Sequence, residues 1–352
     1  MFFESLIICL LKNNHMFKVE HDRDITQLTT IKVPARAQYF AILKKRADIY
    51  SALEYAKQHG LDIYILGGGS NVVFTKKIKG LVLKNEIKGI EILKKTKSKV
   101  IVRASSGENW SRFVSYTIDQ GFYGLENLFL IYGTVGAAPV QNIGAYGVEL
   151  KDVFLSLRAV DLKSGKEKEF TLEACRFAYR ESVFKHKLKG RFFITDVTFK
   201  LDIKPRFKLD YGPIKTKLKE RGIKKPNLKQ IVDIISEIRN SKLPNPYQIP
   251  NAGSFFKNPE VGFSVYKKLL KKYPDMPAFK LEKKVKIPAA WLIEQAGFKG
   301  KKYGKVAMYE KQALILTNDG GSAAEVLALV KRVKKKVKFL FGLDLEEEVN
   351  II

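Results

Sequence analysis

Two glycine-rich segments have the composition of loops that bind phosphorylated ligands. The first, GGGSN at residues 67–71, follows the strand-like run LDIYIL, and the second, GTVGAAPVQNIGAYG, spans residues 133–147. Glycine lets backbone N–H groups approach an anion because it has no Cβ, and successive N–H groups form a concave nest for phosphate. The first segment lacks the Walker A and Rossmann spacings. The two segments indicate a dinucleotide-type cofactor, and the alternative is two tight structural loops.

Three other segments carry side chains suited to acid–base or carboxylate chemistry. Arg180, within YRESVFKHK, presents a planar fork that matches carboxylate or phosphate. Ser254 follows NAG and resembles a hydroxyl on a strained turn. Without GxSxG or a plausible histidine partner, a proton donor is a better interpretation than a nucleophile. The acidic run 346–348 could place one carboxylate in a cleft. The alternatives are a basic surface turn, a loop serine and a solvated edge.

The composition argues against several classes of protein. Cys9 and Cys175 are far apart with no CxxC, and the four histidines are scattered, so we expect no disulfide scaffold and no metal site. Lys and Arg number 64 against 36 Asp and Glu, a formal net charge of +28. Such a surface attracts anions. Because lysine pairs occur along most of the chain, scattered solvated lysines are favoured over a clustered nucleic-acid site, which remains an alternative.

The elements that would position these residues follow from periodicity. The chain has 352 residues, 45% of them hydrophobic, which allows two or three domains with buried cores. Apolar spacing and glycine stops predict helices over residues 43–60, 108–121, 230–242, 289–300 and 322–342, the last with a capping box. Short apolar or alternating runs predict strands over residues 61–66, 72–74, 80–83, 89–104, 153–162, 166–172, 192–203, 313–318 and 345–352, with a hairpin turn at 163–165. This mixture indicates an α+β protein.

Two segments divide the chain. LPNPYQIPNAG, at residues 243–253, has three prolines and predicts a boundary or mobile connection. The N-terminal apolar run is about ten residues, too short to span a bilayer, and no small-residue cleavage site follows it. We therefore expect residues 1–15 to be an extension, with the functional chain beginning at Met16. With no other long apolar run and two unpaired thiols, the sequence indicates a cytoplasmic protein.

Seven motifs together resemble one enzyme family. LGGGSN, GLENL, GTVGAAPVQNIGAYG, YRESVFK, NAGSFFKNP, WLIEQAGFKG and LEEEV occur in this order, as in the UDP-N-acetylenolpyruvoylglucosamine reductases. These flavoenzymes complete UDP-N-acetylmuramate for bacterial peptidoglycan. The likeness covers roughly residues 20–350, and seven motifs in order are far more specific than any one of them.

The resemblance implies a fold and a reaction. The fold would be a two-part FAD-binding module of the vanillyl-alcohol-oxidase type, residues 16–92 and 93–242, followed by an α+β substrate-binding domain, residues 243–352. FAD would be bound non-covalently and reduced by NADPH. The substrate would be UDP-N-acetylglucosamine enolpyruvate, which receives hydride from N5 of the reduced flavin. The protein would be a monomer in the cytoplasm, with no nucleic-acid or membrane partner. An oxidase of the same fold is the alternative enzyme.

The resemblance also assigns residues. Ser254 would donate the proton, and Arg180 and Glu348 would flank the enolpyruvyl group. Tyr211, in LDYGPI, matches the tyrosine that covers the diphosphate in the first type of the family. Substrate or nicotinamide contacts would be Tyr179, Tyr211, Lys242, Asn258 and Gln295. FAD contacts would be Gly67, Gly68, Gly69, Ser70, Asn71, Gly133, Thr134, Gly136, Ala137, Gln141, Asn142, Gly144, Ala145 and Tyr146.

The sequence departs from the family pattern at two positions that bear on the site. Tyr132 stands where proline usually precedes GTVG, and Asn350 stands where arginine usually follows the final Glu-Val. The chain also stops four residues after Glu348, whereas some first-type members continue. We expect the departure at Tyr132 to be conformational, whereas Asn350 and the short end affect the groups expected to support Glu348.

Overall fold

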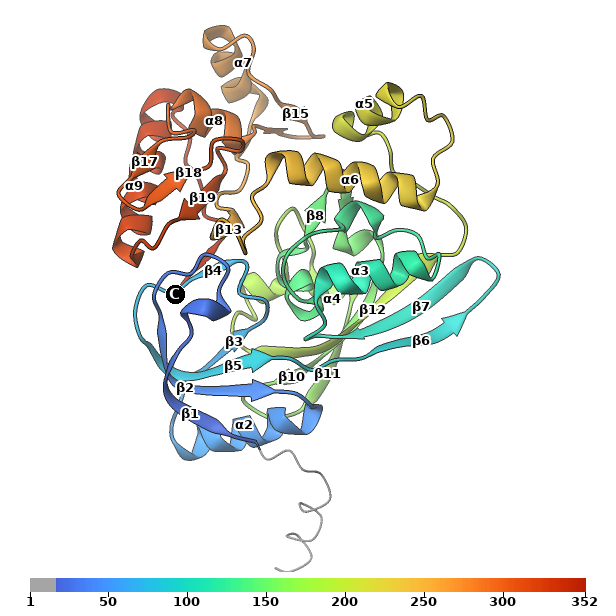
Figure 1. Cartoon of the computed structure of the whole chain (residues 1–352), viewed down its shortest axis with the longest axis vertical. Helices are drawn as coiled ribbons and strands as arrows, with labels where there is room; N and C mark the ends of the chain where they lie inside the picture. Colours follow the sequence, from blue (N-terminus) through green and yellow to red (C-terminus); the bar gives the residue numbers. More distant parts are fainter. Residues whose placement is uncertain (1–16) are drawn as a thin grey trace, which may run out of the picture.

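The computed structural model describes residues 17–352 and is drawn in Figure 1. The predicted extension, residues 1–15, and the start at Met16 lie outside the described residues. No helix within residues 17–352 is long and apolar enough to cross a membrane.

The first part of the chain builds a four-stranded sheet in the order β1-β2-β5-β3. Strands β2, β5 and β3 pair in parallel, whereas β1 runs antiparallel to β2. Helix α2 connects β2 to β3 and lies against the sheet, with Ile49 and Ala52 buried (Figure 1). The elements are β1 (Val19–Asp24), β2 (Arg36–Leu43), α2 (Arg46–Gln58), β3 (Ile63–Leu66), β4 (Val72–Val73) and β5 (Ile78–Asn85).

The second part is a five-stranded antiparallel sheet in the order β11-β10-β12-β7-β6. Helix α3 covers it, because Trp110 and Phe113 pack on Phe199 of the central strand. The predicted hairpin turn is confirmed, with Gly165 N donating to Asp161 O at 2.8 Å. The elements are β6 (Ile90–Lys95), β7 (Lys99–Ser105), α3 (Trp110–Asp119), β10 (Phe154–Asp161), β11 (Glu167–Thr171), α4 (Leu172–Cys175) and β12 (Phe192–Asp202).

Short elements and two helices surround this second sheet. The segment 133–147 forms a 3-10 helix and a two-residue hairpin, which confirms that it is no ordinary helix or strand. Helices α5 (Gly212–Glu220) and α6 (Leu228–Lys242) share a small core that includes Tyr146 and Tyr211. The short elements are η1 (Thr26–Leu28), η2 (Glu126–Leu128), η3 (Val135–Gln141), β8 (Gly144–Ala145), β9 (Val148–Glu149), η4 (Leu150–Asp152) and η5 (Val183–Lys185).

The C-terminal part is an α+β unit with its own core. Its main sheet has the order β13-β19-β18-β17, and a smaller sheet has the order β14-β16-β15. The predicted capping box is confirmed, since Ser322 Oγ accepts from Glu325 N at 3.3 Å, and Gly342 ends α9 with φ 69°. The elements are β13 (Asn251–Ser254), β14 (Glu260–Val261), α7 (Phe263–Lys272), β15 (Phe279–Lys280), β16 (Val285–Lys286), α8 (Ala289–Gln295), β17 (Lys302–Tyr303), β18 (Val306–Met308), β19 (Ile315–Asn318) and α9 (Ala323–Phe341).

The end of the chain returns to the first part. Strand β20 (Asn350–Ile351) pairs in parallel with β4, so the C-terminus lies beside the segment that follows the first glycine loop (Figure 1). The predicted strand 345–352 is therefore regular only at its end, although Glu347 also forms an isolated bridge with Phe256. This return places the C-terminal residues against the first part of the chain, and we call the boundary between the C-terminal part and the two preceding parts the seam. The domain boundaries at 92/93 and 242/243 remain a prediction.

Candidate active site

The two glycine-rich loops lie against each other, and glycine is required at their contact. A Cβ on Gly67 would lie 2.7 Å from Thr134 Oγ1, and one on Gly68 would lie 2.7 Å from the Gly133 Cα. Ser70 Oγ donates to Tyr132 O at 2.9 Å, which ties the loops beside this contact. The result is a half-buried contact formed largely by backbone, which we call the glycine cradle, and backbone without side chains is what a bound phosphate or flat ring requires.

At two other glycines of these loops, close packing alone explains why no side chain is tolerated. Gly69 has φ 66°, and a Cβ there would lie 2.0 Å from Leu28 O. A Cβ on Gly136 would lie 2.4 Å from Ser106 Cβ. For these two positions the structural interpretation, a close backbone approach, is sufficient without a ligand.

Asn71 joins both loops to the C-terminal strand. Its Nδ2 donates to Gln141 Oε1 at 2.7 Å and lies 3.3 Å from Glu348 O. Asn350 N and Nδ2 both donate to Asn71 O, at 3.1 and 3.0 Å. The departure at position 350 therefore still supplies support beside Glu348, through an amide instead of a guanidinium.

The adjacent amide, Asn142, positions the turn that carries Arg180. Asn142 has φ 43°, and its Nδ2 donates to Ala178 O at 3.0 Å and to Glu149 Oε2 at 3.1 Å. Its Oδ1 accepts from Lys151 N at 3.0 Å. With both ends of the amide engaged, Asn142 connects the second glycine loop to the Arg180 turn.

Arg180 lies at the tip of a tight turn in a strained conformation. Ala178 and Glu181 exchange two backbone hydrogen bonds of 3.1 Å, and Arg180 between them has φ 55°. A positive φ at a residue with a long side chain costs free energy and persists only where surrounding contacts hold it. Arg180 Nη2 donates to Gly144 O at 2.8 Å, and Nε lies 3.0 Å from Glu348 Oε1 without forming an aligned hydrogen bond.

Glu348 is a buried carboxyl, 8% exposed, on the segment between α9 and β20. Burial raises the pKa of Glu348, and the nearby cations Arg180, Lys185 and Lys257 only partly oppose that rise. Glu348 N donates to Phe255 O at 2.9 Å, so the backbone of Glu348 lies directly beside the residue after Ser254.

Ser254 ends β13 at a local irregularity. Gly253 has φ 71°, and the pairing of β13 with β19 shifts register between Asn251 and Ser254. Asn251 holds the backbone that leads into Ser254. Its Oδ1 accepts from Gly253 N at 2.9 Å, its N donates to Thr30 O, and its O accepts from Thr30 Oγ1. A tight turn that only glycine adopts readily therefore precedes Ser254, and groups on both sides of the seam hold it. Within residues 17–352 the Ser254 hydroxyl has no hydrogen bond.

The predicted substrate contacts are brought together only in part. Burial raises the pKa of the Tyr179 hydroxyl, which has Asn258 beside it. Tyr211 lies edge-on to Tyr146, with ring centroids 5.4 Å apart. Two further residues, Lys242 and Gln295, are exposed at the ends of α6 and α8 and contact none of these groups in the described part of the chain.

Two family models match the chain. One, described as an FAD binding domain, matches residues 37–171, and the other, the C-terminal domain of UDP-N-acetylenolpyruvoylglucosamine reductase, matches residues 245–352. The reductase of that name from Pseudomonas fluorescens (strain Pf0-1) is 43% identical over 335 residues, which covers 95% of this chain and 98% of the relative. The one from Flavobacterium johnsoniae is 41% identical over 338 residues, 95% of this chain and 100% of the relative. The chain belongs to the UDP-N-acetylenolpyruvoylglucosamine reductase family.

A solved structure has the same fold. The UDP-N-acetylenolpyruvylglucosamine reductase of Thermus caldophilus superposes with a TM-score of 0.68 at 22% identity, covering 96% of this chain and 99% of that one. The predicted class is confirmed: α+β, with an FAD-binding module followed by a C-terminal domain. As a member of this reductase family, the chain is a flavin-dependent oxidoreductase of peptidoglycan synthesis.

The family's cofactor fits the residues present. FAD carries a diphosphate and a flat ring system, and the contact of Gly67–Gly68 with Gly133–Thr134 offers backbone where any Cβ would intrude. Burial lowers the pKa of the Arg239 guanidinium, whose Nη2 donates to Leu130 O at 3.0 Å beside the second loop. A cation in this position complements an anionic cofactor or substrate.

The sequence interpretation missed several charged residues of this site. Arg239 lies one helical turn before Lys242 on α6, so the spacing of the two cations was a usable signal. Lys257 and Glu181 stand inside motifs already singled out, NAGSFFKNP and YRESVFK. Their side chains meet only because the two motifs meet in space, which no local pattern reveals.

Metal and thiol chemistry find no support in residues 17–352. No group of three His, Cys, Asp or Glu in the described chain is placed to hold a metal ion. Burial raises the pKa of the Cys175 thiol to about 12, which leaves it protonated and unreactive at neutral pH.

Proposed function

We propose that this chain reduces the enolpyruvyl group of UDP-N-acetylglucosamine enolpyruvate to give UDP-N-acetylmuramate, with NADPH as the reductant. The observation that carries the proposal is the Arg180–Glu348 pair, set beside Ser254 and beside the glycine cradle. A guanidinium, a buried carboxyl and a hydroxyl are the groups that such a reduction requires. The proposed setting is a monomer in the cytoplasm.

The glycine loops 67–71 and 133–147 would hold FAD, without a covalent bond. Bound there, the flavin supplies two-electron hydride chemistry between NADPH and the substrate. The chain's own contribution is to place the enolpyruvyl group over the cradle and to stabilise the charge that develops on it.

Arg180 would stabilise that charge. Hydride addition to the vinyl carbon leaves an enediolate on the substrate carboxylate, and groups bound more tightly to this state than to the substrate lower the barrier. A guanidinium is always charged and binds both carboxylate oxygens. Its turn, held in a strained conformation by Gly144 O and Glu348, is organised before the substrate arrives.

Ser254 would complete the reaction by protonating the neighbouring carbon. A serine hydroxyl is a weak acid, so it donates only to a strong base such as the enediolate and only when closely placed. The fixed turn at Gly253 supplies that placement. Glu348 is paired with Arg180 in the free site; when the substrate carboxylate takes over that guanidinium, burial favours the protonated form of Glu348, which can then donate a hydrogen bond to the same charge.

The remaining predicted contacts would bind the nucleotide end of the substrate or the nicotinamide. Tyr179 and Asn258 lie near each other. Lys242, Tyr211 and Gln295 lie on separate elements around the seam, so they would contact the long substrate at separate points along its length.

Tyr211→Phe should raise the apparent KM for the substrate while FAD stays bound. Tyr211 precedes α5 and contacts Tyr146 through its ring, so phenylalanine keeps the packing and removes only the hydroxyl meant for the diphosphate. Losing one hydrogen bond to a charged group costs about 1.5–3 kcal/mol, roughly ten- to a hundred-fold in KM. Steady-state kinetics and the visible spectrum measure both effects.

The matched control for Tyr211→Phe is Tyr50→Phe, which removes a hydroxyl that donates to Glu167 on another part of the protein. Its KM should equal that of the parent. Purification of Tyr211→Phe without flavin would contradict the assignment, because the residue would then serve the cofactor.

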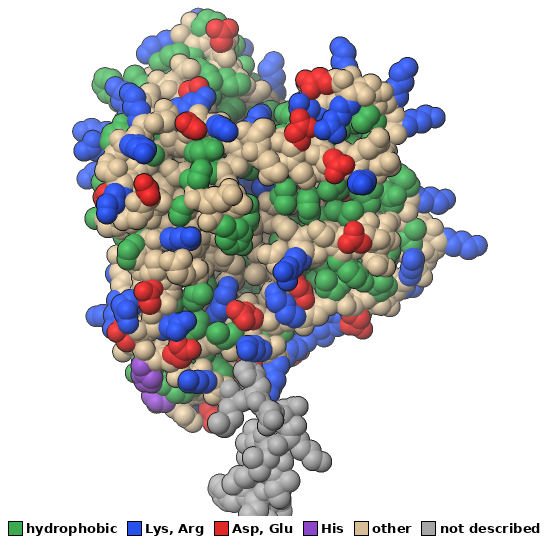
Figure 2. All heavy atoms as spheres, viewed as in Figure 1, with side chains coloured by type: hydrophobic (Ala, Val, Ile, Leu, Met, Phe, Trp, Pro, Cys, Tyr) green, Lys and Arg blue, Asp and Glu red, His purple; other side chains and the backbone are tan. Residues whose placement is uncertain are grey.

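The proposed function is tested by the colour of the purified protein. It should be yellow, and NADPH without oxygen should bleach it. A colourless protein that takes up no FAD would contradict the proposal and favour the nucleic-acid alternative. On the face drawn in Figure 2, however, Lys and Arg are scattered with Asp and Glu between them, which does not favour a nucleic-acid patch.

A further inference from the structure

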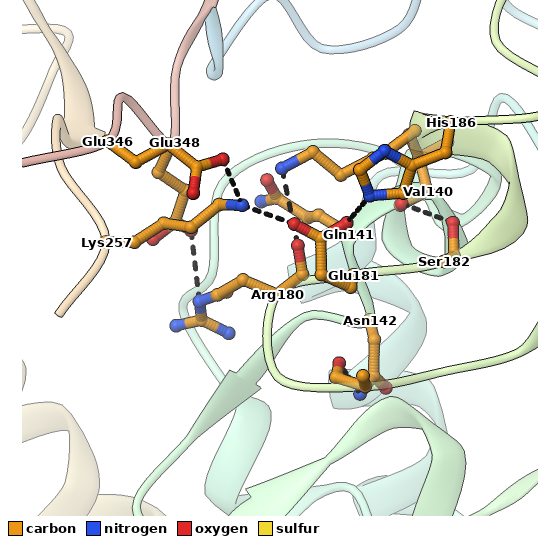
Figure 3. A network of polar contacts seen from close by, with 12 residues as sticks. Val140, Gln141, Asn142, Arg180, Glu181, Ser182, His186, Lys257, Glu346 and Glu348 are labelled. Carbon is orange, nitrogen blue, oxygen red and sulfur yellow. Dashed lines mark hydrogen bonds and ion pairs between the residues drawn. The ribbon is translucent and has the colours of Figure 1, made fainter. Parts of the chain in front are cut away.

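A second ion pair crosses the same seam beside Arg180 and Glu348. Lys257 lies on the segment after Ser254, and its ammonium group contacts Glu181 and lies 2.6 Å from Glu346 Oε1. Figure 3 shows Lys257 between these two carboxylates, with the Arg180–Glu348 pair next to it. Two ion pairs therefore join the Arg180 turn to the C-terminal part.

The two pairs have opposite polarity. Arg180 and its neighbour Glu181 carry opposite charges on one turn, and they face Glu348 and Lys257 on the other side of the seam. A shift of the turn by one residue would place like charges together, so this pattern fixes how the turn docks.

Glu181 is well placed to transmit this docking to Arg180. It closes the turn through its backbone hydrogen bonds with Ala178, leaving Tyr179 and Arg180 at the tip. From the turn's own side, Asn142 holds Ala178 O. In the described part of the chain, the contact with Lys257 is the ion pair that holds Glu181 from the C-terminal side.

The Lys257 side chain is charged and nearly inaccessible. It is 8% exposed, and although burial lowers the pKa of Lys257, Glu181 and Glu346 outweigh that effect and raise it above its usual value. Burial also raises the pKa of Glu181, but Lys257 and His186 bring it below its usual range. Removing one partner of such a pair leaves a charge in a poorly solvated place, so the contact is not an incidental surface bridge.

We propose that Lys257 is a positioning residue that acts through Glu181 to hold the Arg180 turn in register while Arg180 binds the reacting carboxylate. The inference rests on the proposed function. Arg180 must share its guanidinium between Glu348 and the substrate, so its own ion pair is weakened when the substrate binds. The Lys257–Glu181 pair contacts no reacting atom and therefore persists through the reaction.

The experiment measures both half-reactions of the holoenzyme by stopped flow, for Lys257→Met, Glu181→Gln and the double variant. Bleaching of the flavin by NADPH should stay close to the parent rate. Recovery of the colour with the enolpyruvyl substrate should slow about ten- to a hundred-fold, because a small misplacement of a group that binds the transition state has effects of this size. The double variant should be no slower than the slower single variant, and Lys257→Arg should recover most of the rate.

The matched control is Glu347→Gln. Glu347 is paired with Lys334 of α9 at 2.7 Å, so the substitution breaks an ion pair of the residue next to Glu346 but away from the Arg180 turn. Both half-reactions should then be unchanged. If Lys257→Met does not fold, Glu181→Gln still tests the proposal. In that variant Lys257 retains its ion pair with Glu346, so no buried charge is left without a partner.

Two results would overturn the inference: a parent recovery rate in folded Glu181→Gln, or equal slowing of both half-reactions. Either of these two results could be obtained even though the parent enzyme reduces the enolpyruvyl substrate normally. Failure of the proposed function is a different result, because the parent itself would then show no recovery with the substrate.

Discussion

Ser254→Ala should leave the reduction of the flavin by NADPH close to the parent rate and abolish most of the reaction with the enolpyruvyl substrate. The first half-reaction needs no proton from Ser254, whereas the second ends with a proton placed on carbon. Loss of a positioned proton donor costs about 10²–10⁴-fold. The upper end of that range is expected here, because the nearby Thr30 hydroxyl already donates to Asn251 O at 2.6 Å. Stopped-flow absorbance at the flavin bands follows both steps.

Ser254→Cys is the informative companion. A thiol is the stronger acid, so it should recover part of the rate if proton donation is the role of the side chain. A serine that only shapes the turn at Gly253 predicts another pattern, a modest loss shared by both half-reactions together with lower stability. Equal slowing of the two steps would remove Ser254 from the reaction and leave Arg180 and Glu348.

Glu348→Gln should slow the second half-reaction by about 10²–10³-fold, the usual cost of losing one group that stabilises developing charge. Burial raises the pKa of Glu348, so the carboxyl is protonated at low pH and loses its proton as the pH rises through that raised value. If the protonated form donates to the enediolate, the parent rate should fall as the pH rises. The glutamine variant should lack that part of the pH profile.

The control for Glu348→Gln is again Glu347→Gln, the adjacent residue, whose carboxylate is directed to Lys334. It should keep the parent rate and the parent pH profile. A parent rate that increases as the pH rises through the raised pKa of Glu348 would show that the ionised carboxylate is the active form, and the assigned role would be wrong.

The sequence predicted most elements of this fold because their signals are local. Helix α9 follows from its apolar spacing, the Ser322 cap and the Gly342 stop, and all three are present. Hairpin β10–β11 follows from alternation and a turn at Lys163–Gly165. Strand β2 and helices α5 and α7 were not predicted. The α7 sequence FSVYKKLLKK buries only Leu269, so its pattern was too weakly apolar to recognise.

What the sequence could not predict is how distant segments meet. The parallel pairing of β20 with β4 joins Asn350 to Val72, which are 278 positions apart in the sequence. Neither two-residue strand has a sequence pattern that predicts its partner. The Arg180–Glu348 pair was expected only from the family resemblance, and its neighbour Lys257–Glu181 was not expected at all. Such pairs form because one part of the chain docks on another, and this docking is not encoded in any local periodic pattern of the sequence.

One anaerobic experiment tests the central claim most directly. The holoenzyme is bleached with one equivalent of NADPH, and one equivalent of UDP-N-acetylglucosamine enolpyruvate is then added without oxygen. The account predicts that the oxidised flavin spectrum returns in full and that one equivalent of UDP-N-acetylmuramate is formed. A flavin that stays bleached until oxygen is admitted would contradict the account and identify an oxidase of the same fold.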